Sequence, residues 1–338
     1  MKKSARPWTP LVGVTDLIGR FMILMEVFRA RLASRFSGLR PTTFEYAVHE
    51  GRSLQLDLYL PSSGETCPLI IYFHAGAWRA GSRKDVERGV LAQVKRGYAV
   101  ASVSYSLSDK AKWPAQLHEA KAAVRWLRAH AGEHGLDPDR FIAWGLSAGG
   151  HMAAMLGVSE GVAELEGELG SNEESSRVQA VVSWCGPSDF LQMGRGKIIN
   201  HDSPKSPESR LIGGPIQDLP ERVRLANPIA YVHSNVPPCY LAHGDADLLV
   251  PYQQSEILHD ALREAGVSVE LEIQKGYGHG DPRFNTGRRI KGVQSFLERY
   301  LMAPATVSRR SRFSTTRSLK ARKNSSSLVA KPSIVERS

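Results

Sequence analysis

One stretch of the chain, residues 141–151, restricts the fold more than any other. The apolar run Phe-Ile-Ala-Trp leads directly into Gly-Leu-Ser-Ala-Gly-Gly-His, and small residues continue behind it. This order is typical of a strand that turns sharply into a helix, with Ser147 at the apex of the turn. Gly145 and Gly149 lack side chains, so the turn can be tight and the helix can pack close to the strand. We therefore expect a strand–turn–helix unit that exposes the Ser147 hydroxyl at a helix N-terminus.

The middle of the chain alternates apolar runs with segments of helical periodicity. Strands are expected at 43–50, 54–60, 69–73, 98–103, 141–144, 178–184, 239–242 and 267–273. Helices are expected at 84–96, 114–132, 148–157, 252–265 and 289–301. Continuously apolar strands that alternate with helices are the signature of a mainly parallel sheet covered on both faces. The predicted fold class is therefore α/β.

Composition divides the chain into three parts. Residues 1–40 form a basic amphipathic segment, residues 41–303 the α/β domain, and residues 304–338 a basic tail that should be disordered because large apolar residues are few. Within the domain, residues 187–236 interrupt the alternation and are rich in Gly, Pro and Ser. We interpret this interruption as a lid or a substrate-pocket insert.

The positive charge of the chain belongs to its two ends. The formal net charge is +10, of which residues 1–40 carry +6 and residues 303–338 carry +8, so the middle is at −4. The charge therefore gives no reason to expect nucleic-acid binding by the central domain. Residues 1–40 could contact an anionic membrane surface, but packing on the chain's own domain or on a partner explains an amphipathic helix equally well.

Cysteine usage and the N-terminus bear on location. The three cysteines are odd in number and fit no metal motif, and Cys185 and Cys239 lie beside apolar runs as buried thiols would. These features favour a reducing, cytoplasmic compartment, with a peripheral-membrane or exported location as the alternative. Asp16, Arg20 and Glu26 interrupt the N-terminal apolar run, which makes it a poor signal peptide and too short a membrane span. Nothing in the sequence indicates the oligomeric state.

Ligand sites in sheets of this kind lie beyond the carboxyl ends of the strands. The strand at 69–73 is followed by His74-Ala-Gly-Ala-Trp78, where small residues let backbone N–H groups point into a site. Acyl transfer needs such donors, because negative charge develops on the carbonyl oxygen in the transition state. The N–H of Ala148, directly after the serine, would be a second donor.

Two later strand ends supply an acid and a base. His243-Gly-Asp-Ala-Asp247 follows the strand at 239–242, and either Asp245 or Asp247 could orient a histidine. His279 lies on the glycine-rich loop after the last strand, from which it could reach the serine as a general base. Of the other histidines, His74 is expected to brace the loop at 74–78, and His151 to pack inside its helix. Ser147, an aspartate and His279 follow the triad order of α/β-hydrolases.

With these motifs in place, the chain resembles the α/β-hydrolase esterases of the hormone-sensitive-lipase and carboxylesterase type. It is most similar to the group with bifunctional feruloyl/acetyl-xylan esterases and kynurenine formamidase. The likeness spans about 42–302 and rests on the motifs at 57–61, 74–81, 113–116, 137–140, 145–151, 186–189 and 243–251.

The resemblance implies an α/β-hydrolase fold and assigns the remaining roles. Asp247 rather than Asp245 fills the acid position, and the oxyanion donors are Gly76 and Ala77 with Ala148. Trp78 belongs to the same loop motif. The chain departs from the family at Ala75 and Ala77, where relatives usually have glycine. Backbone donors survive that change, although the loop has less freedom.

The sequence thus predicts a serine hydrolase that cleaves a small carboxylic ester, with a short-chain or aryl acyl group, through an acyl-enzyme. Such chemistry requires neither a metal nor an organic cofactor. An arylformamidase and an oligopeptidase-like peptidase are the alternatives within enzymes. A catalytically silent binding protein on the same fold is the alternative outside them.

Overall fold

A computed structural model describes residues 12–194 and 198–302 of the chain. The strands are β1 Thr42–His49, β2 Arg52–Tyr59, β3 Cys67–Phe73, β4 Ala99–Val103, β5 Leu136–Leu146, β6 Ala180–Trp184, β7 Cys239–Gly244 and β8 Val269–Gln274. The α-helices are α1 Val12–Arg35, α2 Arg88–Leu91, α3 Ala115–Ala129, α4 Ala148–Val158, α5 Ala163–Glu166, α6 Pro207–Ile212, α7 Pro220–Arg224, α8 Gln253–Glu264 and α9 Gly287–Leu297. Short 3₁₀ turns occur at 94–96, 190–192, 216–218, 228–231 and 282–285, and a π-helical turn at 298–302. The predicted tail at 304–338 and the first eleven residues lie outside the described part.

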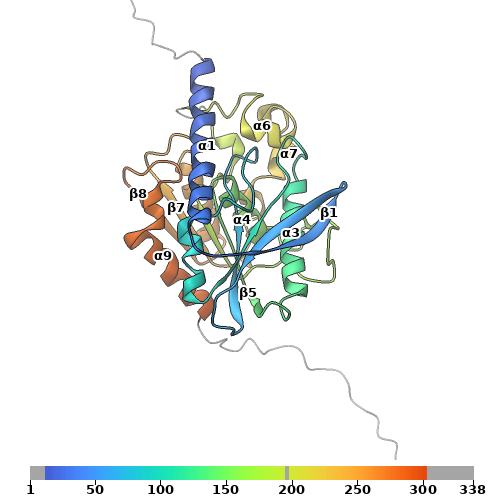
Figure 1. Cartoon of the computed structure of the whole chain (residues 1–338). Coiled ribbons are helices and arrows are strands. Elements are labelled where there is room, and N and C mark those ends of the chain that lie inside the picture. The colour runs from blue at the N-terminus through green and yellow to red at the C-terminus, as the bar shows by residue number, and fades with distance from the viewer. Residues whose placement is uncertain (1–11, 195–197, 303–338) are drawn as a thin grey trace, which may run out of the picture. The chain divides into compact units, whose positions relative to one another are not determined.

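The eight strands form one mixed sheet in the order β1-β2-β4-β3-β5-β6-β7-β8 (Figure 1). The pairs β1–β2 and β2–β4 are antiparallel, and every later neighbour is parallel. The predicted α/β class is confirmed, and β1 and β2 form a hairpin whose turn contains Gly51 with a φ of 73°. Because the parallel strands point the same way, the loops that follow β3, β5, β7 and β8 meet at one edge of the sheet.

Two apolar cores cover the two faces of the sheet, which explains why its central strands are apolar throughout. In β3, Leu69 and Ile71 belong to one core while Ile70 and Tyr72 belong to the other, because successive side chains point to opposite faces. Helices α3, α4, α5 and α8 contribute to the first core, and α2 and α9 to the second. All these strand side chains are at most 1% exposed.

The helix predicted at 84–96 is wrong in length. Only Arg88–Leu91 is α-helical, and a 3₁₀ turn follows at 94–96. The residues before it are held as a loop, because Asp85 is bound by Arg31 of α1 and Glu87 has extended backbone angles. Tertiary contacts with α1 therefore override the local helical pattern.

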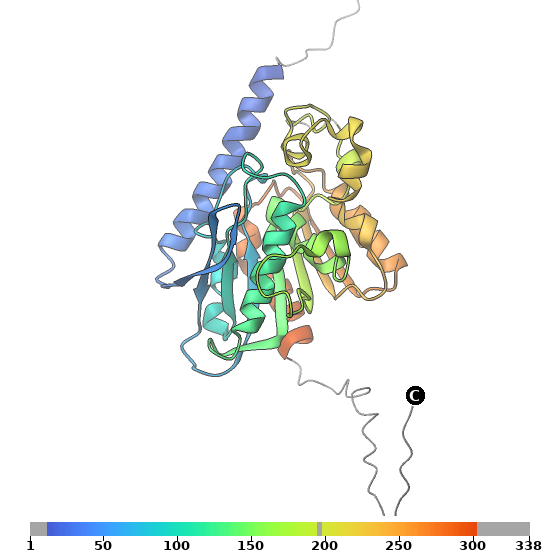
Figure 2. The same ribbon diagram turned by 90° about the vertical axis from the view of Figure 1, so that its right-hand side faces the viewer.

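The N-terminal helix α1 packs on the domain through one face. Gly19, Ile23, Glu26 and Ala30 are buried along it, one helical turn apart. Figure 2 shows α1 and residues 198–236 rising on either side of the same end of the sheet. None of the helices in the described ranges has both the length and the apolar character that crossing a membrane demands.

Candidate active site

The turn between β5 and α4 holds Ser147 in a strained backbone conformation, with φ 58° and ψ −121°. The two flanking glycines are required by close contacts. A Cβ at Gly145 would lie 2.0 Å from the carbonyl oxygen of Gly149, and a Cβ at Gly149 would lie 2.0 Å from that of Phe73. The strand–turn–helix unit predicted from the sequence is therefore built as expected, and the helix begins directly behind the serine.

The structure brings together the three residues that the sequence singled out. His279 Nε2 lies 2.7 Å from Ser147 Oγ, and His279 Nδ1 lies 2.6 Å from Asp247 Oδ2. Because a carboxylate only accepts, Nδ1 carries a hydrogen, and in the neutral ring Nε2 accepts the serine hydroxyl. Asp245 stays outside this chain of contacts, since its carboxylate accepts from the N–H of Gly276 at 2.6 Å.

Asp247 is held by donors that the sequence reasoning missed. Its Oδ1 accepts from the N–H groups of Leu249 and Val250 at 2.8 and 2.9 Å, and His243 Nε2 lies 3.0 Å from Oδ2. His243 Nδ1 lies 2.8 Å from the hydroxyl of Ser255, which fixes the ring. The four-residue spacing between His243 and Asp247 was the available signal for this contact.

The attraction between Asp247 and His279 opposes the effect of burial on the pKa of each group. Burial disfavours the ionised carboxyl of Asp247, but the charge of His279 and the hydrogen bonds from both histidines hold its pKa well below the usual value. Burial likewise disfavours a charged His279, but Asp247 and Glu26 outweigh it and raise the pKa of this imidazole to about 9. The site is therefore arranged to stabilise an imidazolium, the ion that forms when a histidine takes a proton from serine.

The loop at 74–78 faces the serine across a pocket. Gly76, Ala77 and Trp78 all have positive φ, at 120°, 54° and 54°, which for an alanine and a tryptophan is strained backbone. Ala77 and Trp78 line the same pocket as Ser147 and Ala148. Ala148 is the first residue of α4, where a backbone N–H has no partner within its helix.

His74 and His151 occupy packing positions, as the sequence suggested. The His74 ring stacks on Tyr105 at 4.3 Å between centroids, and its Nδ1 donates to the carbonyl of Ala75 at 2.8 Å. His151 donates from Nε2 to the carbonyl of Ala226 at 2.6 Å, with its ring against Trp78. Burial lowers the pKa of each histidine to about 4, so both are neutral at neutral pH.

The pocket next to Ser147 encloses about 340 Å³, including the part open to solvent. Its walls come from α1, the loop at 74–78, the serine turn, residues 187 and 199–208, and the loop after β7. The lining residues are Ile23, Ala77, Trp78, Ser147, Ala148, Pro187, Ile199, His201, Pro207, Glu208, Leu249, Val250 and His279. The interrupting segment therefore does form a wall of this pocket, and so does the N-terminal helix.

One carboxyl group and one histidine–glutamate pair near the serine were not predicted. Glu26 of α1 is 5% exposed, and its Oε1 lies 3.8 Å from His279 Nε2. In the wall formed by the insert, His201 Nδ1 lies 3.1 Å from Glu208 Oε2. The signal for Glu26 was a single acidic residue in an apolar helical run, which the sequence reasoning used only as evidence against a signal peptide.

Cys185 lies beside Asp247 and His279, and within the described ranges these three are the group whose ligand atoms come close enough to share a metal ion, within 4.8 Å. The nitrogen and the carboxylate are already hydrogen-bonded to each other. Burial raises the pKa of the Cys185 thiol well above its usual value, so it stays a neutral thiol and a poor metal ligand or nucleophile.

Residues 56–262, more than half of the chain, match the model of the BD-FAE family. The chain belongs to the BD-FAE family of α/β-hydrolase esterases. The BD-FAE match includes the 74–78 loop, Ser147 and Asp247, and it leaves α1 and His279 outside its limits.

Relatives and solved structures agree with this BD-FAE membership. Esterase LipQ of Mycobacterium tuberculosis is 30% identical over 223 residues, which is 65% of this chain and 52% of LipQ. Esterase LipC of the same organism is 30% identical over 63% of this chain and 53% of its own length. The chain thus spans about half the length of these curated relatives.

Among solved structures, a truncated carbohydrate esterase from gut microbiota has a TM-score of 0.70 and 32% identity, covering 77% of this chain and 96% of that one. Esterase 2 of Thermogutta terrifontis with bound propionate has a TM-score of 0.63 and 25% identity, covering 78% and 96%. Both structures share the α/β fold described above.

Proposed function

We propose that this protein is a serine carboxylic ester hydrolase that works through an acyl-enzyme on Ser147. The observation that carries the proposal is the unbroken line of contacts from Asp247 through His279 to Ser147, at 2.6 and 2.7 Å. Membership of the BD-FAE family and the esterase names of the relatives support it.

In the proposed reaction, Ser147 Oγ attacks the ester carbonyl carbon while His279 Nε2 takes the hydroxyl proton. The C–O bond to the alcohol then breaks, and His279 returns the proton to the departing alcohol oxygen. Water repeats the sequence on the acyl-enzyme, releasing the carboxylic acid and restoring Ser147. Asp247 keeps the ring oriented and stabilises the imidazolium in both halves.

The backbone N–H groups of Gly76, Ala77 and Ala148 are the proposed donors to the oxyanion. Ala77 and Ala148 line the same pocket as Ser147, and α4 points its N-terminus at this place. The positive φ values at Gly76 and Ala77 turn the chain sharply away from the extended conformation of β3. Such preorganised donors are typical of acyl-transfer sites.

The proposed acyl group is short or aryl. The space beside Ser147 is small, and Ile23, Leu249 and Val250 make its walls apolar. The Thermogutta esterase, which has the same fold, binds propionate and butyrate in its solved structures. An arylformamidase remains the second candidate, because the same attack on a formamide needs no further group.

A fluorophosphonate probe and a substrate panel test the proposal. The probe should label the wild-type protein and fail to label Ser147→Ala, which should also lose about 10⁴-fold or more of its turnover of p-nitrophenyl acetate. Near-normal turnover by this variant would overturn the serine mechanism. Across p-nitrophenyl esters of rising chain length, kcat/KM should peak at short acyl groups, and N-formylkynurenine separates the formamidase alternative.

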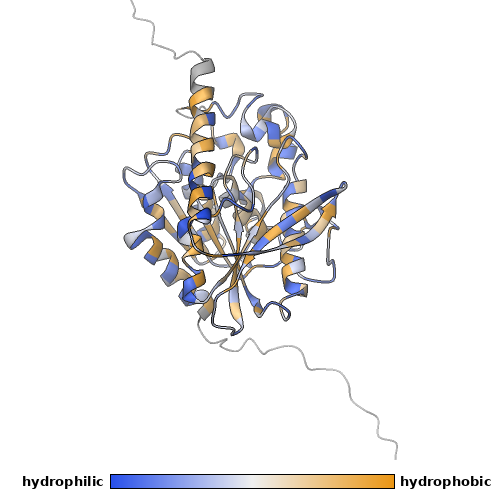
Figure 3. Ribbon diagram, in the orientation of Figure 1, coloured by the Kyte–Doolittle hydropathy of each residue, from blue (hydrophilic) through white to orange (hydrophobic). Residues whose placement is uncertain are grey.

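We also propose that α1 contacts an anionic lipid surface. Its outer face carries a stripe of large apolar side chains, in which Phe21 is 62% and Phe28 is 54% exposed. Much of the ribbon of α1 is orange in Figure 3, the colour of hydrophobic residues. The stripe is formed by Leu17, Ile18, Phe21, Leu24, Met25, Phe28, Leu32 and Phe36. Residues 1–40 carry a net charge of +6, which complements anionic headgroups.

Vesicle flotation tests this contact. The wild-type protein should float with phosphatidylglycerol-containing vesicles and much less with pure phosphatidylcholine, and the double change Phe21→Ser, Phe28→Ser should abolish flotation. Val48→Ser removes an equally exposed apolar residue from β1 and should change nothing. If the wild type does not float but forms a dimer that the double variant breaks, a second copy covers the stripe and the lipid proposal is wrong.

A further inference from the structure

Glu26 brings a carboxyl group from α1 to the proposed general base. It is 5% exposed, and its Oε1 lies 3.8 Å from His279 Nε2, the nitrogen that also faces Ser147. Neither oxygen of the carboxyl group has a hydrogen-bond partner within the described part of the chain. Burying a carboxyl group without such partners costs folding free energy. This cost points to a function for Glu26 next to His279.

The loop that carries His279 is shaped around Glu26. Gly280 has a φ of 53°, and a Cβ atom there would lie 2.4 Å from Glu26 Oε1, so a side chain at this position would be strained and would displace the Glu26 carboxyl group. The guanidinium of Arg29, one turn further along α1, donates to the carbonyl of Gly280. Glu26 and Arg29 of α1 thus both lie against Gly280, the residue next to His279.

Charged and titratable groups surround Glu26 on several elements. Arg29 lies on the same helix, Glu87 at the start of α2, and Asp247 and His279 on the loops after β7 and β8; Tyr72 of β3 and Cys185 after β6 also feel its charge. Of these, His279 exerts the strongest single effect on Glu26. The guanidinium group of Arg29 also lies 3.8 Å from the carboxylate of Glu87. His279 is therefore flanked by two carboxyl groups, Asp247 beside Nδ1 and Glu26 beside Nε2.

We propose that Glu26 is a positioning residue for His279, a second carboxylate partner that sets the pH range over which this imidazole acts as a base. The inference rests on the proposed serine mechanism and adds α1 to it. An ionised Glu26 favours the imidazolium, so it stabilises the charge that develops on His279 during attack. The same charge raises the pH at which the resting imidazolium loses its proton, so activity begins at higher pH.

The two groups titrate as a coupled pair. Burial raises the pKa of Glu26 to about 7, while Glu26 contributes to the raised pKa of His279. Because each group changes the charge that the other feels, their protons leave in two overlapping steps. The acid limb of the kcat/KM profile should accordingly be broad in the wild-type enzyme.

The test is the pH dependence of kcat/KM for p-nitrophenyl acetate with wild type and Glu26→Gln. The variant keeps the shape of the side chain and removes its charge. Its acid limb should fit a single ionisation, with a midpoint lower by about one pH unit. Its activity should exceed that of the wild type at the acid end and fall below it on the alkaline plateau.

Two further variants separate charge from structure. Glu26→Asp keeps a charge on α1 and should restore much of the wild-type limb. Asp245→Asn removes one carboxylate from a neighbouring loop without contact to His279, and its limb should coincide with that of the wild type. A melting temperature for each variant shows that the fold is retained.

An acid limb of Glu26→Gln that overlays that of the wild type would overturn the role of Glu26, even if the fluorophosphonate probe labels Ser147. Failure of the probe to label the wild type would instead contradict the serine mechanism itself. A ¹⁵N NMR titration of His279 gives the same answer without turnover: its midpoint should fall in Glu26→Gln and stay fixed in Asp245→Asn.

Discussion

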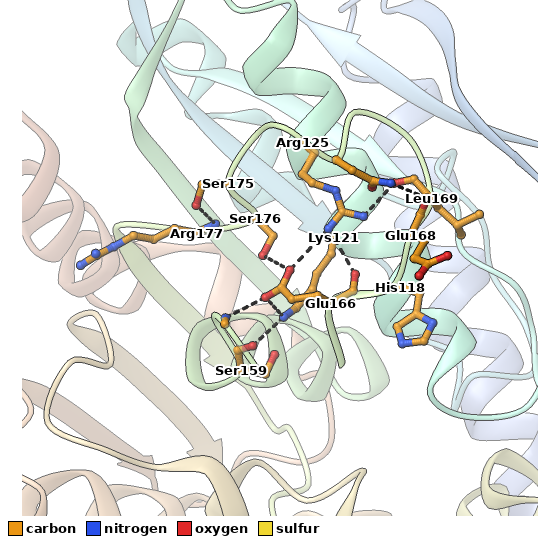
Figure 4. A network of polar contacts seen from close by, with 12 residues as sticks. His118, Lys121, Arg125, Ser159, Glu166, Glu168, Leu169, Ser175, Ser176 and Arg177 are labelled. Atoms are coloured by element: carbon orange, nitrogen blue, oxygen red, sulfur yellow. Dashed lines mark hydrogen bonds and ion pairs between the residues drawn. The ribbon is translucent and has the colours of Figure 1, made fainter. Parts of the chain in front are cut away.

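Glu166 and Glu26 both place a carboxyl group beside a basic side chain, yet their surroundings differ in burial and in hydrogen bonding. The Glu166 side chain is 27% exposed and that of Glu26 is 6% exposed. Glu166 accepts hydrogen bonds from Lys121 Nζ at 2.6 Å, from the N–H of Gly161 at 2.8 Å and from the hydroxyl of Ser176 at 2.8 Å (Figure 4). Glu26 lies 3.8 Å from its histidine and has no hydrogen-bond partner in the described ranges. The carboxylate of Glu166 thus accepts several hydrogen bonds, whereas that of Glu26 accepts none in the described ranges.

The proton affinities follow from this difference. Burial opposes ionisation of Glu166, but the bonds from Lys121 outweigh it and lower the pKa of the carboxyl. Burial dominates at Glu26 and raises its pKa to about 7. A carboxylate with its hydrogen bonds made is a structural anchor, whereas a bare one beside a proposed catalytic base is available to change its charge.

The largest effect that this comparison predicts concerns Asp247, a buried carboxylate whose donors include the proposed base. Asp247→Asn should lower kcat by about 10³–10⁴-fold, because an amide cannot stabilise the imidazolium and favours the wrong tautomer of His279. Steady-state kinetics on p-nitrophenyl acetate measure this loss. Asp245→Asn, two residues away, should stay within about twofold of wild type; a large loss there would mean that the acid has been assigned to the wrong aspartate.

Breaking the structural pair should instead affect stability. Lys121 is fully buried, and Lys121→Met leaves Glu166 without its main cation, which should cost about 3 kcal/mol of unfolding free energy. Urea denaturation measures this loss, and kcat of the folded variant should be unchanged. Lys110→Met removes the exposed pair with Asp109 and should cost less than about 0.5 kcal/mol, so equal losses in both variants would contradict the assignment.

The sequence allowed prediction of the features that strand ends impose. The serine turn, the two later loops and the order of Ser147, Asp247 and His279 follow from local patterns. An apolar run ending in glycines or acids marks a strand end, and parallel strands bring their ends together. The insert at 187–236 was recognised as pocket wall because it broke the alternation.

Contacts between distant segments were beyond the reach of such patterns. Glu26 approaches His279 from 253 positions away in the chain, and nothing in an apolar helix indicates which turn will dock on which loop. The helix predicted at 84–96 failed for a related reason, since Arg31 of α1 holds Asp85 in a loop. The N-terminal helix is therefore responsible for the main errors, in the fold and in the site alike.

The last predicted effect is a stability change with a definite sign in pH. The pKa of Glu26 rises from 4.5 to about 7 on folding, so folding favours its protonated form. Below pH 4.5 Glu26 is protonated in both the folded and the unfolded state and does not lower the stability of the wild type. The wild type then loses stability as pH rises through about 7. Glu26→Gln removes that loss, and relative to wild type it should gain at most about 3 kcal/mol between pH 5 and pH 8.

Glu166→Gln should show the opposite trend. Its folded pKa lies below 4.5, so the stability that Glu166 contributes is present above that value and disappears as pH falls through the folded pKa. The deficit of Glu166→Gln should therefore be present at pH 7 and shrink on acidification, while the advantage of Glu26→Gln grows on alkalinisation. Denaturation curves across pH test both, and parallel trends for the two variants would mean that hydrogen bonding does not distinguish the two carboxyl groups.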